Sequence, residues 1–346
     1  MKRLIFVSIP LFLICTCLAK PFFGISYGPF RAGQAPGGTY PTLAQIEEDI
    51  SIISQMSRAC RNYGIDNTLN SIPDYCYAYD VDCYVGCWLS GTPATDQNTI
   101  SDLLDIASRG YSTTKALIVG NEYIYGHGSS GVSYLEALLD QVNAATDIPV
   151  TTGEPCDVWL DYPSLVSHVD FIGIHVYGYW NGVDIADAAQ EVFDRYTDIK
   201  QAYPSKEVMI FETGWPTQGD THYSAVPSVA NQEIFLKEFS LLARQHNIKY
   251  FMFEAFDEPW KGAGVESNWG LYYENRSPKA STQAVFDANP ADIDFSGSVN
   301  MTDLTMQAFD WLIYTDPNGL PLPGDRNQDN ITDYADFAIT CQYWLD

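Results

Sequence analysis

The sequence predicts a (β/α)₈ barrel, and three observations support this fold class. Eight short β-rich runs recur along the chain, and most are continuously apolar at their centres, as is typical of parallel strands covered on both faces. Helical stretches alternate with these runs, which favours eight βα units closed into a barrel. No glycine-rich dinucleotide fingerprint follows the first run, which disfavours an open doubly wound sheet. The eight runs are FFGISYGPF (22–30), ACRNYGI (59–65), CYVGCWL (83–89), KALIVGNE (115–122), IPVTTGEP (148–155), DFIGIHVYGYW (170–180), EVMIFETGWP (207–216) and KYFMFEAFDEPW (249–260).

The helices expected between the runs are amphipathic, with apolar residues spaced for one buried face. The helix of the second βα unit is the least clearly indicated, because only the short segment IPDYCYAY follows that strand. SPKASTQAVFDA (277–288) is expected to close the set as the eighth helix. The other expected helices are LAQIEEDISIISQMS (43–57), ISDLLDIASRG (100–110), SYLEALLDQVNAA (133–145), IADAAQEVFDRYTDIKQAY (185–203) and ANQEIFLKEFSLLARQHN (230–247).

The N-terminal segment has the pattern of a secretory signal peptide. MKR is basic, LIFVSIPLFLICTCL is apolar, and Ala19 is a small residue suited to cleavage. The apolar run is too short for a good membrane span, and no later segment is long and apolar enough for one. We therefore predict that residues 1–19 are a signal peptide and that the remaining chain is exported, to the extracellular space, the periplasm or the cell surface.

Charge and composition narrow the partners of the chain. The formal net charge of −26 argues against nucleic acid and anionic membranes. Aromatic residues make up 14% of the chain, with Tyr and Trp abundant, as in clefts where sugar rings stack on aromatic faces. Six cysteines remain after the signal peptide, and their fifteen pairings stay open. Structural bridges or buried thiols are favoured over a metal site, since the spacing of a zinc site is missing.

In a barrel of this kind the catalytic residues lie at the carboxyl ends of the strands, where the βα loops gather. Polar and aromatic residues do occupy these positions here. They are Tyr27, Trp88, Glu122, Glu154, Tyr177, Glu212 and Glu258. One rim of the barrel is therefore the expected site.

Two of these glutamates suggest a reaction. Glu122 in VGNEY follows the fourth strand and Glu212 in FETGW follows the seventh, so their carboxylates are expected to face each other across the barrel mouth. A pair about 5 Å apart suits retaining glycoside hydrolysis, with one acid/base and one nucleophile. Asn121 is placed to hydrogen-bond the sugar 2-hydroxyl. His175 is expected to be a hydrogen-bonded histidine at the barrel end, because no partners at metal-ligand spacing accompany it.

The barrel sequence resembles the glycoside hydrolase family 17 β-1,3-glucanases, over about residues 24–285 and nearer to the bacterial and fungal branches than to the plant enzymes. The motifs that carry the resemblance are GISYGPF, IVGNE, VTTGEPCDVWLDYP, VDFIGIHVYGYW, IFETGWPT and FEAFDEPWKGAGVESNWGLY. The resemblance implies that Glu122 is the general acid/base and Glu212 the nucleophile. It also implies that Tyr177 hydrogen-bonds the nucleophile.

Further binding positions follow from the same resemblance. Glu258, Lys261 and Glu266 match a polar cluster beside the cleft, with a surface ion-pair network as the alternative. The aromatic residues are candidate sugar platforms or, individually, core residues. Tyr27 is included among the substrate-binding candidates, and the platforms are Trp88, Tyr125, Trp180, Trp215, Trp260 and Trp269.

The resulting functional prediction is a secreted, monomeric endo-β-1,3-glucanase that acts on laminarin-type glucan and needs no cofactor for catalysis. A β-1,3-glucanosyltransferase that uses the same residues is the alternative, since water and an acceptor sugar compete for one covalent intermediate. A glucan-binding protein on an inactive barrel is a second alternative, which the presence of both glutamates disfavours. We predict a catalytic domain over residues 20–289.

The segment 290–346 has a different composition. From Ala291 onward there are ten Asp and one Arg, with no Lys or Glu. Two similar units lie 33 residues apart, DIDFSGSVNMTDLTMQAFDWL and DRNQDNITDYADFAITCQYWL. Oxygen side chains at loop positions 1, 3, 5, 9 and 12 suit Ca²⁺. They are Asp292, Asp294, Ser296, Asn300 and Asp303, then Asp325, Asn327, Asp329, Asp333 and Asp336.

Each of these loops is followed by one helix, and position 12 is Asp rather than Glu. The pair resembles a dockerin-type repeat, which implies a small all-α calcium module that docks to a cohesin or to a cell surface. A calcium-free acidic linker, or a simple anchor or cap, is the alternative.

Overall fold

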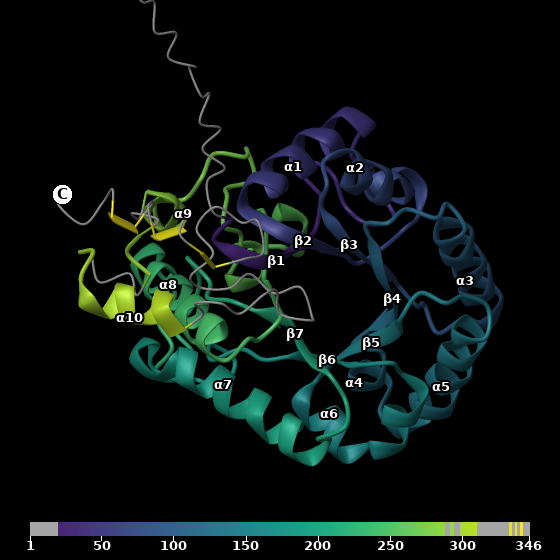
Figure 1. Cartoon of the computed structure of the whole chain (residues 1–346). Coiled ribbons are helices and arrows are strands. Elements are labelled where there is room, and N and C mark those ends of the chain that lie inside the picture. Colours follow the sequence, from purple (N-terminus) through teal and green to yellow (C-terminus); the bar gives the residue numbers. More distant parts are fainter. Residues whose placement is uncertain are drawn as a thin grey trace, which may run out of the picture.

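Eight parallel strands close into a barrel in chain order. The computed structural model describes residues 20–287, 291–293, 298–309, 332–333, 336–337 and 340–341. Figure 1 shows the strands at the centre and the helices outside them. The fold class predicted for the catalytic part of the chain is confirmed. The strands are β1 (Phe22–Tyr27), β2 (Ser57–Asn62), β3 (Asp82–Cys87), β4 (Thr114–Asn121), β5 (Val150–Pro155), β6 (Ile172–His175), β7 (Val208–Thr213) and β8 (Tyr250–Met252).

The barrel closes where β1 pairs with β8, with Gly24 opposite Phe251. All eight strands are buried along most of their length, which explains their continuous apolar runs. Register shifts fall near the carboxyl ends of β4, β6 and β7. These are the strand ends that carry the polar residues of the barrel mouth.

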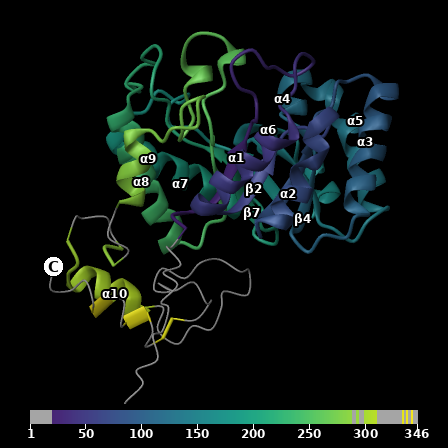
Figure 2. The same cartoon turned by 90° about the horizontal axis from the view of Figure 1, so that it is seen from above.

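Helices cover the outside of the barrel. α3 and α5 lie side by side in both views (Figures 1 and 2). The short second unit is confirmed as a 3₁₀ turn followed by α2. The helices are α1 (Leu43–Met56), α2 (Ile72–Ala78), α3 (Pro93–Ala107), α4 (Tyr123–His127), α5 (Ser129–Asn143), α6 (Cys156–Asp161), α7 (Ile185–Ala202), α8 (Val229–Gln245), α9 (Ala280–Phe286) and α10 (Met301–Phe309). The 3₁₀ turns are η1 (Asn67–Ser71), η2 (Pro163–His168), η3 (Pro259–Lys261) and η4 (Val265–Ser267).

The ends of several helices follow from local sequence. Thr42 and Gln45 form a capping box at the start of α1. Asp184 caps α7 and Ser228 caps α8, each accepting a hydrogen bond from a backbone N–H of the first turn. The short helices α4 and α6 follow β4 and β5 almost at once, and the sequence pattern did not predict them.

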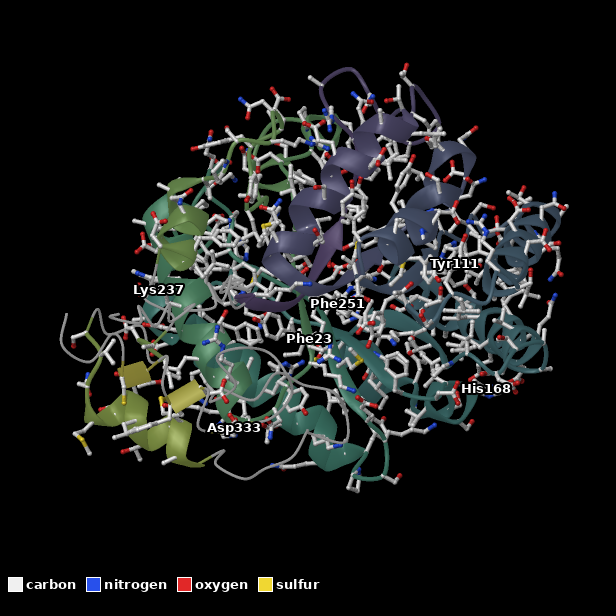
Figure 3. All side chains as sticks on the ribbon, turned by 45° about the horizontal axis from the view of Figure 1, so that its top comes forward. Phe23, Tyr111, His168, Lys237, Phe251 and Asp333 are labelled. Atoms are coloured by element: carbon white, nitrogen blue, oxygen red, sulfur yellow. The ribbon has the colours of Figure 1, made fainter. Side chains whose placement is uncertain are left out.

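Aromatic rings fill the interior of the barrel beneath its polar mouth. Phe251 contacts Phe23, Tyr84 and Phe211 edge to face, at centroid distances of 6.0, 4.9 and 5.7 Å. Figure 3 labels Phe23 and Phe251 next to each other near the barrel centre. A Cβ at Gly173 would lie 2.5 Å from the Phe211 ring, so this close packing requires glycine there. The interior is therefore a packed core that supports the polar mouth.

The described residues of the C-terminal segment show matched contacts in the two units. Asp303 Oδ2 accepts a hydrogen bond from Asn300 N at 2.8 Å, and Asp336 Oδ2 accepts one from Asp333 N at 2.8 Å. Thr340 Oγ1 donates to Gln307 Oε1 at 2.7 Å, and these two residues lie 33 positions apart, like the units themselves. The two units of the repeat thus make the same hydrogen bond at equivalent positions.

Candidate active site

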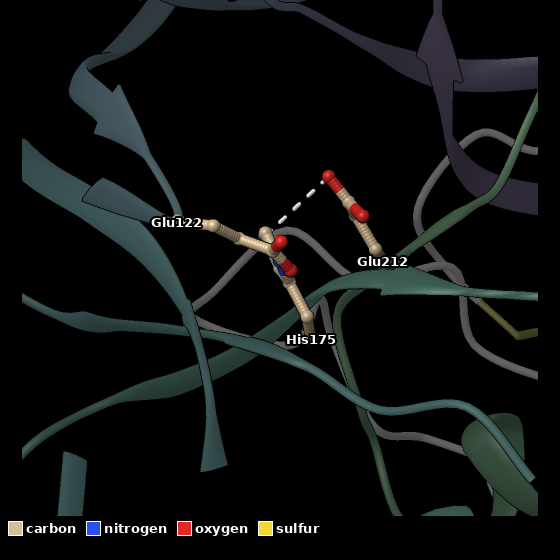
Figure 4. A group of neighbouring side chains, drawn as sticks. All are labelled: Glu122, His175 and Glu212. Carbon is tan, nitrogen blue, oxygen red and sulfur yellow. Dashed lines mark hydrogen bonds and ion pairs between the residues drawn. The ribbon is translucent and has the colours of Figure 1, made fainter. Parts of the chain in front are cut away.

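Glu122, His175 and Glu212 converge at the barrel mouth (Figure 4). Glu122 follows β4, His175 ends β6, and Glu212 lies in β7. His175 stands between the carboxylates, with Nδ1 2.6 Å from Glu122 Oε1 and Nε2 3.5 Å from Glu212 Oε1. The interpretation of His175 as a hydrogen-bonded histidine is consistent with these contacts.

The two carboxylates are close together. One oxygen from each lies, with a nitrogen of His175, in a group whose atoms are all within 4.8 Å of one another. Retaining glycosidases hold their carboxyl groups about 5–5.5 Å apart, whereas inverting enzymes leave about 6.5–9.5 Å for a water molecule. The spacing therefore suits a covalent intermediate.

The surroundings of Glu212 favour its ionised form. Arg61 Nη1 donates to Oε1 at 2.7 Å, and the Tyr177 hydroxyl donates to Oε2 at 2.7 Å. Burial alone would raise the pKa of Glu212, but His175, Arg61 and Tyr177 together outweigh it and lower the pKa to about 2. Glu212 is therefore held in the carboxylate form, which a nucleophile requires.

Glu122 has different surroundings. Its side chain is 34% exposed and that of Glu212 only 7%. Glu122 Oε1 contacts His175 Nδ1 at 2.6 Å. A carboxyl group that is open to the cleft is suited to exchange a proton with a bound sugar oxygen.

Arg61 is the main site residue that the sequence analysis missed. This arginine is 1% exposed, within β2, and its guanidinium also hydrogen-bonds Asn121 Oδ1 and the Tyr63 hydroxyl. It links Glu212 to Asn121, the residue next to Glu122. A charged residue inside the apolar run ACRNYGI was the available signal, since an arginine is buried in a strand only when it is paired.

A second charged cluster lies beside the first. Lys261 Nζ is 2.9 Å from both carboxylate oxygens of Glu254 and 2.8 Å from Glu258 Oε2. Burial raises the pKa of Glu254 well above its usual range, while Lys261 and Glu254 help to hold that of Glu258 low. Glu266 faces the same cleft. The predicted cluster thus assembles, with the addition of Glu254.

A cleft of about 990 Å³ is lined by Glu122, Glu212, Glu258, Lys261 and Glu266. Four of the aromatic residues predicted as platforms lie along it with open faces. They are Trp88, Tyr125, Trp180 and Trp260, which are 57%, 68%, 43% and 42% exposed. Exposed rings in a cleft suit the apolar faces of sugars, which stack on aromatic side chains.

Comparison with known families identifies the barrel. Residues 24–270 match the BtgE/BtgC glycoside hydrolase domain, which is more than half of the chain. The chain belongs to the BtgE/BtgC glycoside hydrolase family.

Relatives of this BtgE/BtgC chain include a glucan endo-1,3-β-glucosidase btgC of Emericella nidulans, 26% identical over 298 residues. That alignment covers 76% of this chain and 46% of the relative, so the chain spans less than half the length of the relative. A glycoside hydrolase family 17 β-1,3-glucanosyltransferase structure from Rhizomucor miehei is 29% identical, with a TM-score of 0.66, covering 75% of this chain and 96% of that one. An endo-laminarinase from Formosa, 19% identical with a TM-score of 0.64, shares the fold and covers 73% and 84%.

Three predicted contact residues of the BtgE/BtgC barrel are buried. Trp215 is 1% exposed, does not line the cleft, and donates from Nε1 to the Val226 carbonyl at 3.0 Å. Tyr27 is fully buried, and its hydroxyl bonds Asp49 at 2.9 Å. Trp269 is also fully buried, although both it and Tyr27 border the cleft. The structure therefore gives these rings no open face for a sugar, and Trp215 in particular is a core residue.

The site is a poor match for a metal ion. Among the described residues, Glu122, His175 and Glu212 form the one group of potential ligands that is compact enough. However, Arg61 places a positive charge 2.7 Å from Glu212 Oε1, and Tyr177 occupies Oε2. These partners already neutralise or bond the Glu212 carboxylate, whose negative charge would otherwise attract a cation.

Other predictions have mixed outcomes. The cysteines at 60, 76, 83, 87 and 156 are buried free thiols, and Cys341 is exposed. No helix within the described ranges is long and apolar enough to cross a bilayer. The signal peptide lies outside the described residues. So do Asp294, Ser296, Asp325, Asn327 and Asp329 among the predicted calcium ligands.

Proposed function

We propose that the chain is a secreted retaining endo-β-1,3-glucanase that cleaves laminarin-type glucan. The observation that carries this proposal is the pair of close carboxylates in unlike surroundings, one buried against Arg61 and one open to the cleft. Membership of the BtgE/BtgC family and the names of the relatives support the glucan substrate.

In the proposed reaction, Glu122 protonates the glycosidic oxygen while Glu212 attacks the anomeric carbon. The bond from that carbon to the leaving sugar breaks, and a covalent glycosyl-enzyme forms. Glu122, now a carboxylate, removes a proton from water, which displaces Glu212 and releases the product. Asn121 is assigned to the 2-hydroxyl, and its side chain is already oriented by Arg61. The chemistry needs only these carboxylates and no cofactor.

The substrate is assigned to the cleft that these residues line. Trp88, Tyr125, Trp180 and Trp260 are proposed as platforms for glucose rings. Lys261, Glu258 and Glu266, which line the same cleft, are proposed to contact sugar hydroxyls, and the Tyr177 hydroxyl is proposed to orient the nucleophile. Trp215 is not part of this proposal.

The test is Glu212→Gln, with reducing-sugar release from laminarin as the measurement. We expect a loss of at least about a thousandfold, because an amide cannot form the covalent intermediate. Glu207→Gln is a matched control, since Glu207 immediately precedes the same strand and pairs with Lys249 on the surface. Full activity in Glu212→Gln, with circular dichroism unchanged, would refute the assignment.

A β-1,3-glucanosyltransferase is the second candidate, favoured by the similarity to the Rhizomucor miehei enzyme, of which 96% is covered. Both reactions share the glycosyl-enzyme and differ in the acceptor. Mass spectrometry of products from a linear β-1,3-gluco-oligosaccharide separates them. Products longer than the donor indicate transfer, and only shorter products indicate hydrolysis.

We further propose that residues 1–19 direct export and that residues 290–346 bind Ca²⁺ as a dockerin-like pair, which docks to a cohesin-type or cell-surface partner. The matched hydrogen bonds of Asp303 and Asp336 support two equivalent loops. The ligand set is the ten residues predicted from the sequence, of which Asp292, Asn300, Asp303, Asp333 and Asp336 are described.

A further inference from the structure

Glu154 lies at the carboxyl end of β5 and is completely buried. Neither the nucleophile nor the acid/base role involves it. Its Oε1 accepts a hydrogen bond from Ile124 N at 2.7 Å, and its Oε2 accepts one from Tyr125 N at 3.1 Å. These two N–H groups belong to the turn that directly follows Glu122. One buried carboxylate therefore holds two consecutive backbone amides beside the acid/base.

The backbone at Glu122 needs such support. Glu122 has φ of +52°, in the left-handed region, which is strained for a residue that carries a side chain. Its own N–H donates to the Gly153 carbonyl at 2.8 Å, immediately before Glu154. The end of β5 thus fixes Glu122 twice, through the Gly153 carbonyl and through the Glu154 carboxylate. Such strained conformations persist only where neighbouring contacts over-determine them.

A carboxylate at this position is electrostatically unfavourable. Burial raises the pKa of Glu154 to about 7, and the charge of Glu122 adds to this, although the two amides and His175 act in the opposite direction. Two buried N–H groups without an acceptor would also be costly. A purely structural role would account for the two hydrogen bonds alone. However, the turn that Glu154 holds begins directly after the acid/base Glu122 and includes Tyr125, an exposed ring of the cleft. This placement indicates that Glu154 also affects the site.

We propose that Glu154 is a positioning residue that holds the acid/base Glu122 in reach of the leaving-group oxygen and sets Tyr125 on the same side of the cleft. This inference rests on the proposed retaining mechanism. Glu154 acts through the backbone amides of Ile124 and Tyr125 and does not touch the substrate.

The consequence is a selective defect in acid catalysis. A sugar leaving group needs a proton from Glu122, whereas 2,4-dinitrophenolate is a good leaving group without one. Since kcat/KM reports steps up to formation of the glycosyl-enzyme, comparing the two substrates isolates protonation. General acid catalysis contributes about 10²–10⁴-fold. A defect in folding or in Glu212 would lower both reactions equally.

The experiment measures kcat/KM of Glu154→Gln on laminaripentaose and on a 2,4-dinitrophenyl β-laminaribioside. The amide keeps one acceptor oxygen but turns an NH₂ donor toward the other backbone N–H. We expect a fall on the order of 100-fold on laminaripentaose and less than about fivefold on the aryl glycoside. Glu122→Gln, which removes the acid itself, shows the largest difference between the two substrates that loss of protonation can produce.

Asp96→Asn is the matched control. Asp96 is also fully buried and also accepts two backbone hydrogen bonds from a mouth loop, from Ser90 N at 2.7 Å and Gly91 N at 3.0 Å. That loop carries no acid/base. We expect Asp96→Asn to change both substrates by the same factor and so to leave their ratio unchanged.

The outcomes separate the hypotheses. Equal losses on both substrates in Glu154→Gln, or no loss, would overturn the positioning role while Glu122→Gln still shows selectivity. If the wild type cleaves neither substrate, the proposed function fails and the positioning role falls with it. If Glu154→Gln does not fold, Glu154→Asp is measured in the same way. It keeps the charge but withdraws the oxygens, and a selective loss is again required.

Discussion

Glu212 and Glu122 are the same residue type, but the barrel gives them unlike surroundings. Glu212 is buried beside Arg61 and Tyr177, and its pKa of about 2 lies below the ordinary 4.5. Because the folded value is the lower one, ionised Glu212 stabilises the fold fully above about pH 4.5. This stabilisation is lost as the pH falls toward 2. One carboxylate is thus kept charged while the other remains open to the cleft.

At the residue scale, Arg61→Met tests how that charge is held. Removing the cation while Glu212 stays buried should raise the pKa of Glu212, and the acid limb of kcat/KM should move to higher pH. We expect activity at pH 5 to fall at least about tenfold. The measurement is a pH profile from pH 3 to 8 on laminaripentaose.

Two further variants interpret the Arg61 result. Arg61→Lys keeps a positive charge and should restore the acid limb, although it cannot bond Asn121 and Glu212 together as a planar guanidinium does. Arg276→Met removes a buried arginine that pairs with Asp49 instead, so its acid limb should not move. An unchanged limb in Arg61→Met would contradict the role of Arg61.

At the element scale, the strand ends were predictable but the short elements between them were not. Glu122, His175 and Glu212 could be placed at the mouth because parallel strands deliver their carboxyl ends to one rim. The helices α4 and α6 were missed since each has too few residues to show helical periodicity. Arg61 was missed because its partners come from β4 and β7, far along the chain.

A buried ion pair also ties α1 to the loop after β8. Asp49 in α1 accepts from the Arg276 guanidinium at 2.8 and 2.6 Å, and from the Tyr27 hydroxyl. Arg31 bonds the same carboxylate at 2.7 Å. This cluster anchors the first βα loop, which forms one wall of the cleft.

Asp49→Asn should therefore lower the free energy of unfolding. Breaking a buried pair leaves Arg276 without compensation, at a cost of about 3–5 kcal/mol. Urea unfolding followed by circular dichroism gives this value. The control is Asp74→Asn, whose partner Arg109 is partly exposed and whose loss should cost less than about 1 kcal/mol. Equal effects in both variants would argue against a special role for Asp49.

At the scale of the whole molecule, the acidic C-terminal units are distinct in sequence from the barrel, and the domain boundaries at residues 289 and 290 stay a prediction. Asp303 and Asp336 are both buried and bond backbone N–H groups at equivalent positions. The last carboxylate of each predicted loop thus bonds the backbone N–H three positions before it.

Isothermal titration of the full chain with Ca²⁺ tests this module. We expect saturable binding that is lost in the double variant Asp303→Asn/Asp336→Asn, because an amide supplies no charge to a hard cation. Laminarin hydrolysis should be the same with calcium and with EDTA, since the proposed reaction uses only the two carboxylates. Equal binding by the double variant would refute the ligand assignment.

The sequence by itself determined the alternation of strands and helices, the strand that each candidate catalytic glutamate follows, and the repeat in the tail. Local patterns decide these features, because burial on both faces gives apolar runs and helical periodicity separates them. Tertiary structure alone decided which partners surround each carboxylate and which rings face the cleft. Arg61 and Glu154 bond partners on other βα units, and Trp215 becomes 1% exposed only in the folded barrel, so no local pattern reports these contacts.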